Sequence, residues 1–241
     1  MNIYGLAKTT LLDYPGFVAS TIFTGGCNFR CPFCHNMNIV ENPDITQKIE
    51  TDTVIEFLQK RAGVIDGVCI TGGEPTLQPD LISFISEIKA LGLKVKLDSN
   101  GTKTDVLNQL IEKNLVDYIA IDVKSSFNKY PEICGLNQST IDKRETDIMI
   151  SNIKNSIYLL INQQSIDYEF RTTLIKEYHD HNTIDEIGKM IKGAKHYYLQ
   201  SFVDSAFVPN HALHAIPKNE LQEYILQLKK YVLDVQLRGI D

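Results

Sequence analysis

The chain has 241 residues, of which 43% are hydrophobic and 22% are charged, a composition typical of a globular protein with one sizeable core. The formal net charge of −6 argues against a nucleic-acid-binding protein, because such proteins carry basic surfaces that neutralise phosphates. No run approaches the roughly 20 apolar residues of a membrane span, and residues 1–16 lack the continuous apolar stretch of a secretory signal. We therefore expect a cytoplasmic protein with neither nucleic-acid nor membrane partners, in a reducing compartment where free thiols survive.

Predicted strands and helices alternate along the chain. Short apolar segments bounded by polar residues or glycine predict six strands, at residues 17–24, 67–71, 93–97, 118–123, 168–173 and 197–201. Apolar residues at helical spacing follow Asp52, Asp80 and Asp105, and similar stripes occupy residues 184–191 and 221–232. This alternation predicts parallel strands joined by right-handed crossovers. Because no linker interrupts the chain, we expect one domain over residues 1–241, with a C-terminal helix over 218–236 packed on it.

Three cysteines, Cys27, Cys31 and Cys34, follow the first predicted strand at the spacing C-x3-C-x2-C. Thiolates are the usual ligands of iron–sulfur clusters, and three of them leave one iron of a four-iron cluster open to a substrate. A zinc site is the alternative, and its fourth ligand would come from His35, Cys69 or Cys134. A disulfide framework is disfavoured because the five cysteines are an odd number. The spacing therefore favours a catalytic metal centre.

The motif C-x3-C-x-aromatic-C, with Phe33 before the last cysteine, is followed by T-G-G-E-P at residues 71–75, and together they resemble the radical S-adenosylmethionine (SAM) superfamily. Within it, further motifs resemble the activating proteins of anaerobic ribonucleoside-triphosphate reductase, which belong to the glycyl radical enzyme activases. These motifs are T-L-L-D-Y-P-G at 10–16, I-F-T at 22–24, C-H-N at 34–36, D-S-N-G at 98–101 and D-V-K at 122–124. The resemblance implies an α/β fold, an open (β/α)6 partial TIM barrel.

All of these motifs are expected at one edge of the fold. In α/β sheets and barrels the chemistry collects at the C-terminal ends of the strands. The cysteine loop follows the first predicted strand, the T-G-G-E-P motif the second, D-S-N-G the third and D-V-K the fourth, and Arg171 lies in the fifth. We therefore expect one active site assembled from five strand ends.

The resemblance implies a 4Fe–4S cluster and SAM as cofactors, with the catalytic cysteines as cluster ligands. Gly72 and Gly73 are expected to leave room for SAM and to accept hydrogen bonds from its amino group, and a tight turn is the alternative. The other expected SAM contacts are Glu74 near the amino group, Phe33 against the adenine, Lys124 at the carboxylate or ribose, Asn100 near the ribose, and Arg171 if its side chain points inward.

Asp98 and Asp122 stand at neighbouring strand ends. The resemblance implies that they bind a monovalent cation beside SAM, and oxygen ligands suit such a hard ion. The alternative is that Asp98 begins a turn through Asn100 and Gly101, and that Asp122 pairs with Lys124.

The implied reaction begins when a one-electron donor such as flavodoxin or ferredoxin reduces the cluster. Reductive cleavage of SAM then gives methionine and a 5′-deoxyadenosyl radical, which removes a hydrogen from one glycine of the partner, anaerobic ribonucleotide reductase. Three alternatives remain open: a pyruvate formate-lyase-type activase, a radical SAM enzyme with a small-molecule substrate, and a metal-binding protein without catalysis.

Other residues are expected outside the chemistry. The pairs His179 and His181, and His211 and His214, have spacings suited to metal binding but are expected in solvated loops. Cys69 is expected to be a small buried hydrophobic residue. Cys134 is also expected to be structural, although a thiol at this place is a candidate for redox chemistry. The late loop, residues 204–216, is expected in solvent, with cover over the active site or contact with the partner as the alternative.

Overall fold

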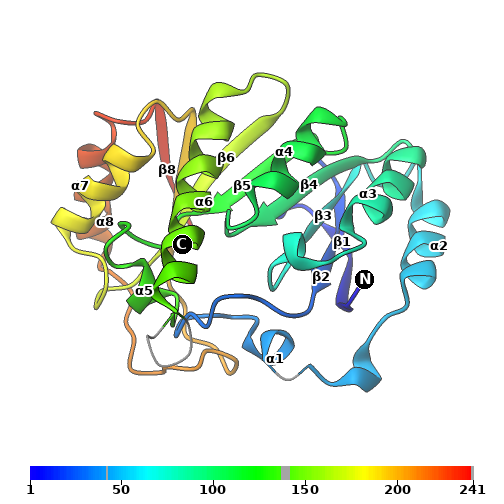
Figure 1. Ribbon diagram of the computed structural model, residues 1–241, viewed down its shortest axis with the longest axis horizontal. Coiled ribbons are helices and arrows are strands. Elements are labelled where there is room, and N and C mark those ends of the chain that lie inside the picture. The colour runs from blue at the N-terminus through cyan, green and yellow to red at the C-terminus, as the bar shows by residue number, and fades with distance from the viewer. Residues whose placement is uncertain (42, 137–141, 240–241) are drawn as a thin grey trace.

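The computed structural model describes residues 1–41, 43–136 and 142–239, and these form one eight-stranded sheet whose strands lie in chain order (Figure 1). The first strand, β1, pairs antiparallel with β2, and every later pair is parallel. The strands are β1 Ile3–Thr10, β2 Ala19–Thr24, β3 Gly67–Gly72, β4 Lys94–Ser99, β5 Tyr118–Asp122, β6 Asp167–Leu174, β7 His196–Ser201 and β8 Asp234–Arg238. Because β1 and β8 do not pair with each other, the sheet is open.

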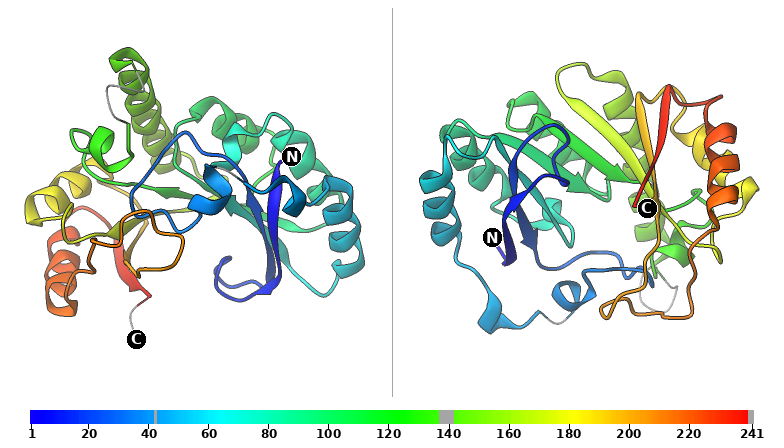
Figure 2. Two further views of the ribbon diagram at one scale, coloured as in Figure 1. Left: turned by 90° about the horizontal axis from the view of Figure 1, so that it is seen from below. Right: turned by 180° about the vertical axis from the view of Figure 1, so that it is seen from behind.

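The longer helices connect the strands and cover the outer face of the curved sheet (Figures 1 and 2). They are α2 Thr51–Arg61, α3 Leu81–Ala90, α4 Thr104–Glu112, α6 Lys143–Asn162, α7 His181–Met190 and α8 Lys218–Leu228. Two single-turn helices, α1 Met37–Val40 and α5 Tyr130–Ile133, lie in the loops that follow β2 and β5. The expected open α/β barrel is confirmed, and all six predicted strands are present as β2 to β7.

Two strands were not expected, and the C-terminal helix is shorter than predicted. β1 escaped prediction because its sequence, IYGLAKTT, contains a glycine and a lysine and buries only Ile3 completely. The helix expected over 218–236 ends at Leu228, and Asp234–Arg238 forms β8 instead. Val235 pairs with Tyr197 of β7, so an apolar spacing that fitted a helix also fits a strand buried on one face.

The two faces of the sheet differ in chemistry. Val95 and Leu97 of β4 are completely buried in the main hydrophobic core, which includes residues of the helices. Alternate residues of the same strand, Lys96 and Asp98, point to the opposite, concave face, because successive side chains of a strand point to opposite sides. The register places Arg171 of β6 beside Asp122 of β5 on that concave face. The inside of the barrel is therefore polar, and the fold holds charges beneath the site.

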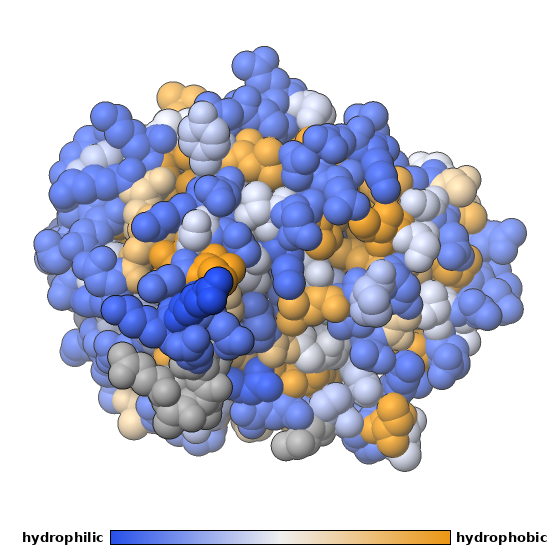
Figure 3. All heavy atoms as spheres, viewed as in Figure 1, coloured by the Kyte–Doolittle hydropathy of each residue, from blue (hydrophilic) through white to orange (hydrophobic). Residues whose placement is uncertain are grey.

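One face of the surface is mainly hydrophilic. Hydrophilic residues dominate the face in Figure 3, and hydrophobic ones are interspersed among them. In the part of the chain that the structure describes, no helix has the length and apolar character needed to cross a membrane.

Candidate active site

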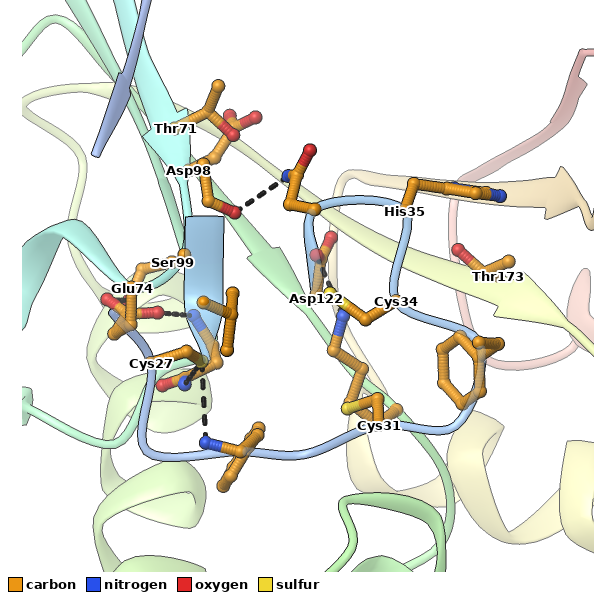
Figure 4. A pocket seen from close by; sticks show the side chains of 18 of the residues that line it. Cys27, Cys31, Cys34, His35, Thr71, Glu74, Asp98, Ser99, Asp122 and Thr173 are labelled. Carbon is orange, nitrogen blue, oxygen red and sulfur yellow. Dashed lines mark hydrogen bonds and ion pairs between the residues drawn. The ribbon is translucent and has the colours of Figure 1, made fainter. Parts of the chain in front are cut away.

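One pocket collects the C-terminal ends of the central strands (Figure 4). Its wall contains eleven of the twelve residues that the sequence singled out: Cys27, Cys31, Phe33, Cys34, Gly72, Gly73, Glu74, Asp98, Asn100, Asp122 and Lys124. The remaining one, Arg171, points to the same concave face and contacts Asp98 and Asp122 just beneath the pocket. The structure therefore brings all twelve residues together, as the strand-end argument predicts.

The cysteine loop, residues 25–36, curves around the three thiols, whose side chains point into the space that it encloses (Figure 4). Backbone contacts hold the loop at both ends. Gly26 donates to Ile39 O at 2.9 Å and accepts from Glu74 N at 2.8 Å. The Asn36 amide donates to Gly72 O at 2.8 Å, so the end of β3 also fixes the end of the loop.

The three thiols differ in their tendency to ionise. Burial raises the pKa of Cys27 to about 12 and also raises the pKa of Cys34. A hydrogen bond from the Cys134 thiol lowers the pKa of Cys31. Because metal ligands must be thiolates, binding of a metal centre at this loop must release protons.

The three thiols surround a space and do not converge on one point. Within the described ranges, no three His, Cys, Asp or Glu side chains converge on a position for one metal ion. A cubane places its cysteine ligands on different irons, so its ligands surround a space and need not meet at one point. His35 is engaged elsewhere, since its Nε2 lies 2.7 Å from Val203 O and its ring stacks on Phe202. Cys69 lies within β3, beside Lys96, so it is a buried residue of the sheet as expected.

The two glycines at the end of β3, Gly72 and Gly73, are required by close backbone contacts. Gly72 has φ +110°, and a Cβ there would lie 2.5 Å from the backbone N and O of Thr24. A Cβ on Gly73 would lie 2.0 Å from Gly26 O. The end of β3 thus packs directly against the start of the cysteine loop, and no side chain separates the two backbones.

Glu74 joins the end of β3 to the end of β4. Its buried carboxylate accepts hydrogen bonds from Thr76 N at 3.1 Å, Ser99 Oγ at 2.9 Å and Asn100 N at 2.6 Å. Burial raises the pKa of this carboxyl, although the hydrogen bonds oppose that shift. The structure therefore uses Glu74 to hold the two strand ends together, a role that the sequence did not reveal.

Asp98 and Asp122 are both engaged by cationic side chains. Arg171 bridges them, with Nη1 3.1 Å from Asp98 Oδ2 and Nε 2.8 Å from Asp122 Oδ1. Lys96 pairs with Asp98, and Lys124 Nζ lies 3.0 Å from Asp122 Oδ2. Burial opposes the ionisation of both carboxyls, but the neighbouring cations outweigh it and lower their pKa values. The alternative pairing of Asp122 with Lys124 is thus present, whereas the turn expected to begin at Asp98 is made by Asn100.

Asn100 connects the cysteine loop to the end of β4. Its amide nitrogen donates to Asn28 Oδ1 at 2.8 Å, and its amide oxygen accepts from Thr102 N at 3.0 Å. Asn28 in turn donates to Thr102 Oγ1 at 2.9 Å. Sequence reasoning missed Asn28, although its place directly after Cys27 was a signal that it could position the first ligand.

Phe33 and Lys124 lie together at the other side of the pocket. The Lys124 ammonium lies 6.0 Å from the centroid of the Phe33 ring, and Phe33 is almost completely buried. Lys124 is held between this ring and Asp122, so its charge lies at the pocket wall.

His179 differs from the expectation of a solvated loop, because its side chain is buried and hydrogen-bonded at both ring nitrogens. Nδ1 accepts from Ile175 N at 3.0 Å, which leaves the proton on Nε2 to donate to Lys124 O at 3.0 Å. Burial lowers its pKa, so the ring is neutral. It thereby ties the loop after β6 to the end of β5.

The other three histidines of the two pairs have exposed side chains, and His211 and His214 lie in a loop as expected, whereas His181 begins α7. The loop 204–216 also packs onto the site, because Asn210 N donates to Pro32 O at 3.1 Å. In Figure 1 this loop, in orange, passes beside the blue cysteine loop. It therefore contacts the cysteine loop, although none of its residues lines the pocket, so cover over the active site stays a prediction.

Comparisons with known proteins agree with this geometry. The family model of the radical SAM superfamily matches residues 21–150. A putative glycyl-radical enzyme activating enzyme of Methanocaldococcus jannaschii is 35% identical over 243 residues, covering 99% of this chain and 96% of that protein. A pyruvate formate-lyase-activating enzyme of Listeria monocytogenes is 33% identical over 132 residues, covering 51% of this chain and 53% of that protein.

Solved structures share the fold at low sequence identity. The structure of Streptococcus suis SuiB bound to S-adenosylmethionine superposes with a TM-score of 0.65 at 13% identity, over 89% of this chain and 48% of that one. A structure of TYW1 with a lysine-pyruvate adduct superposes with a TM-score of 0.60 at 19% identity, over 88% of this chain and 73% of that one. These likenesses support the open barrel.

Proposed function

Because the chain belongs to the radical SAM superfamily and is homologous to glycyl-radical enzyme activating enzymes, we propose that it generates a glycyl radical on anaerobic ribonucleoside-triphosphate reductase. The observation that carries this proposal is the loop of three thiols around a pocket that Lys124, Gly72 and Gly73 also line. The family implies a 4Fe–4S cluster and SAM. The motifs at residues 10–16 and 34–36 favour the reductase as target.

Cys27, Cys31 and Cys34 would hold the cluster through three thiolates. When bound and reduced by a donor such as flavodoxin or ferredoxin, the cluster supplies one electron that cleaves SAM to methionine and a 5′-deoxyadenosyl radical, which takes a hydrogen atom from the glycine Cα. The protein binds and orients the reactants and excludes water. Proton transfer by an acidic or basic side chain is not required.

The charged side of the pocket fits the polar groups of SAM. Lys124 places a cation where it would attract the SAM carboxylate, while its pairing with Asp122 and the backbone bond from His179 hold it in position. Phe33 offers an apolar surface for adenine beside Lys124. The backbone at Gly72 and Gly73, which lines the pocket, is the proposed hydrogen-bond acceptor for the amino group of SAM. Asn100 contributes by holding Asn28, next to the first cluster ligand.

The monovalent cation stays a prediction. Asp98 and Asp122 already share the Arg171 guanidinium, and each has a lysine partner. A cation between the two carboxylates would have to displace Arg171.

We also propose a cytoplasmic location, since five free cysteines suit a reducing compartment.

Pyruvate formate-lyase is the second candidate target. It is favoured by the Listeria relative, but that match spans about half of each chain. The M. jannaschii relative matches nearly the whole chain, and its name specifies no target.

Electron paramagnetic resonance tests both the proposed radical chemistry and the proposed target enzyme. Anaerobically reconstituted protein is reduced and mixed with SAM and the anaerobic ribonucleotide reductase of the same organism. We expect a glycyl doublet on the reductase, absent with the Cys31→Ala variant. A reduced four-iron signal and SAM cleavage without the doublet would reject the reductase and direct the assay to pyruvate formate-lyase. No iron signal at all would reject the radical chemistry.

A further inference from the structure

Arg30 lies in the spacer between Cys27 and Cys31, and the proposed chemistry does not use it. Its chain neighbours Phe29 and Cys31 are buried and line the pocket. Arg30 does not line the pocket, and its side chain is 44% exposed. The side chain therefore lies on the outer side of the cysteine loop.

The Arg30 guanidinium binds the backbone of the loop to which it belongs. Its Nη1 donates to Cys27 O at 2.7 Å and to Phe29 O at 2.8 Å. Among the residues that the structure describes, no backbone N–H donates to either of these carbonyls. The spacer is neither helix nor strand, so this one side chain supplies the hydrogen bonds that the backbone of a regular element would supply.

Other contacts fix Arg30 itself. Its Nε lies 3.1 Å from Glu41 Oε1, at the end of α1. Its backbone N–H donates to Cys134 O at 2.8 Å. The next residue, Gly135, has φ +65° and lies so close that a Cβ there would be 2.3 Å from Arg30 O. Arg30 thus connects the cysteine loop to the end of α1 and to the turn after α5.

These contacts use the geometry of a guanidinium as well as its charge. A guanidinium carries several N–H donors in a planar fork, so one group can bind carbonyls and a carboxylate at once. Here Nη1 serves the two carbonyls while Nε faces Glu41. A lysine ammonium carries all its donors on one atom, so it would keep the charge but lose this arrangement.

We propose that Arg30 is a positioning residue that fixes the backbone between the first two cluster ligands before the cluster binds, so that Cys27 and Cys31 are held in the arrangement that receives it. Without these hydrogen bonds the spacer would have to be ordered at the moment of binding, and that ordering costs conformational entropy. Groups that orient metal ligands also increase the affinity of a site for its metal. The inference rests on the proposed function only in requiring a cluster at the three cysteines.

The test measures how fast the anaerobically reconstituted protein loses iron to a chelator, without SAM or partner. Arg30→Met removes the donors and the charge but keeps an apolar stem. We expect this variant to lose iron about tenfold faster than the wild type, because two hydrogen bonds to the loop are lost. Arg30→Lys, which keeps the charge alone, should fall between the two.

Two further variants are controls for the same rate. Glu41→Gln breaks only the exposed ion pair of Arg30, and such pairs contribute little. Arg144→Met replaces an exposed arginine of α6. Both should lose iron at the wild-type rate.

Chemical rescue distinguishes positioning from a general loss of stability. Arg30→Ala leaves a space at a partly exposed site, and methylguanidinium is small enough to enter it. At low millimolar concentration this compound should slow iron loss toward the wild-type rate, because it restores a planar fork of donors beside the two carbonyls. Methylammonium, which has the same charge without the fork, should not.

Three outcomes would overturn the proposal. If Arg30→Met loses iron at the wild-type rate, the contacts of Arg30 do not hold the loop for the cluster. If methylguanidinium fails to rescue Arg30→Ala, the fork of donors is not what the loop requires. If methylammonium rescues it equally well, the charge acts and the geometry does not. A missing glycyl doublet would reject the proposed target but leave these rates valid, so the two failures are distinguishable.

A measurement on the wild type covers the case in which the variants do not fold. In the cluster-free protein, nitrogen-15 NMR of the arginine side chains should show restricted rotation of the Arg30 guanidinium, compared with that of the exposed Arg144. A guanidinium of Arg30 that rotates as freely as that of Arg144 would also overturn the proposal.

Discussion

The two sides of the pocket are built on different physical principles. At the ends of β2 and β3, backbone lies directly on backbone, as at Gly72 and Gly73, and the carboxylate of Glu74 accepts neutral donors. At the ends of β4 to β6, ion pairs hold Asp98, Asp122, Lys124 and Arg171. The first side presents the thiols in a nearly uncharged setting, and the second places charge where SAM would bind.

The two sides should therefore respond to substitution in different ways. On the thiol side a substitution acts through steric overlap, so it displaces the loop or has little effect. On the charged side a substitution leaves a buried charge without its partner, and its effect depends on pH. Four measurements test the comparison, from the largest expected effect to the smallest.

Arg171→Met should destabilise the protein most, because the partly buried Asp98 and Asp122 lose their shared partner and each keeps only a lysine. Removing one member of a buried ion pair costs about 3–5 kcal/mol, and we expect a loss of that order in the free energy of unfolding. Urea denaturation of the cluster-free protein at neutral pH measures it. The control is Lys189→Met, which breaks an exposed ion pair with Asp185 and should change little. Equal losses in both variants would contradict the electrostatic account.

Gly73→Ala should have the next largest effect, since its Cβ would overlap Gly26 O at 2.0 Å. Overpacking of this kind costs about 1–3 kcal/mol, and here it also displaces the cysteine loop, so reconstituted iron content should fall. Gly92→Ala is the matched control: Gly92 has φ +78° but open space around its Cα. It should cost about 1 kcal/mol and leave the iron content unchanged. A loss of iron in the control alone would refute the steric account.

The pKa values of the carboxyls on the two sides should be shifted in opposite directions from their ordinary values. Burial raises the pKa of Glu74, whereas neighbouring cations lower the pKa of Asp98 and Asp122 despite their burial. The two aspartates thus contribute stability that is present above about pH 4, their value in unfolded chains, and is lost as pH falls. Glu74 contributes stability below about pH 4.3 that is lost as pH rises through its folded pKa.

Carbon-13 NMR of the side-chain carboxyls measures these three pKa values directly. In denaturation experiments, Glu74→Gln should remove the loss of stability that accompanies ionisation of Glu74 while preserving acid destabilisation by the aspartates. A Glu74 carboxyl that titrates below its ordinary value would show that its hydrogen bonds outweigh its burial.

His179→Gln should produce the smallest effect, confined to mildly acidic pH. The neutral ring accepts from Ile175 N, and its pKa is lowered by burial, so the folded protein binds fewer protons there than the unfolded chain. Wild-type stability should therefore decline as pH falls below about 6.5, and the variant should show a flatter profile. His211→Gln, at an exposed histidine paired with Asp204, is the control and should keep the wild-type profile.

Local patterns in the sequence predicted much of the fold, because they depend on neighbouring residues. The stripes after Asp52, Asp80 and Asp105 coincide with α2, α3 and α4. β1 and β8 were missed because their stability comes from pairing with β2 and β7, whose contribution their own residues do not reveal.

The sequence predicted that the twelve residues converge at the strand ends, but it did not predict several contacts among them. Alternation left Arg171 on either face of its strand, and only the register with Asp122 decides the matter. The contacts of Asn28 with Asn100, and of Arg30 with Cys134, join residues more than 70 positions apart. Such pairs depend on how the strand ends converge, and they cannot be predicted from a single sequence.

The order of strands in the sheet has a consequence for biosynthesis. Each strand finds its neighbour already made as the chain emerges, because sheet order and chain order are the same. The cysteine loop is different, since it belongs to the first 40 residues but receives Cys134, Val203 and Asn210 as neighbours only much later. A nascent chain therefore carries uncovered thiols throughout most of its synthesis. Iron and sulfide that bind during synthesis would encounter the cysteine loop without these neighbours, whereas those that bind after synthesis would encounter the complete pocket.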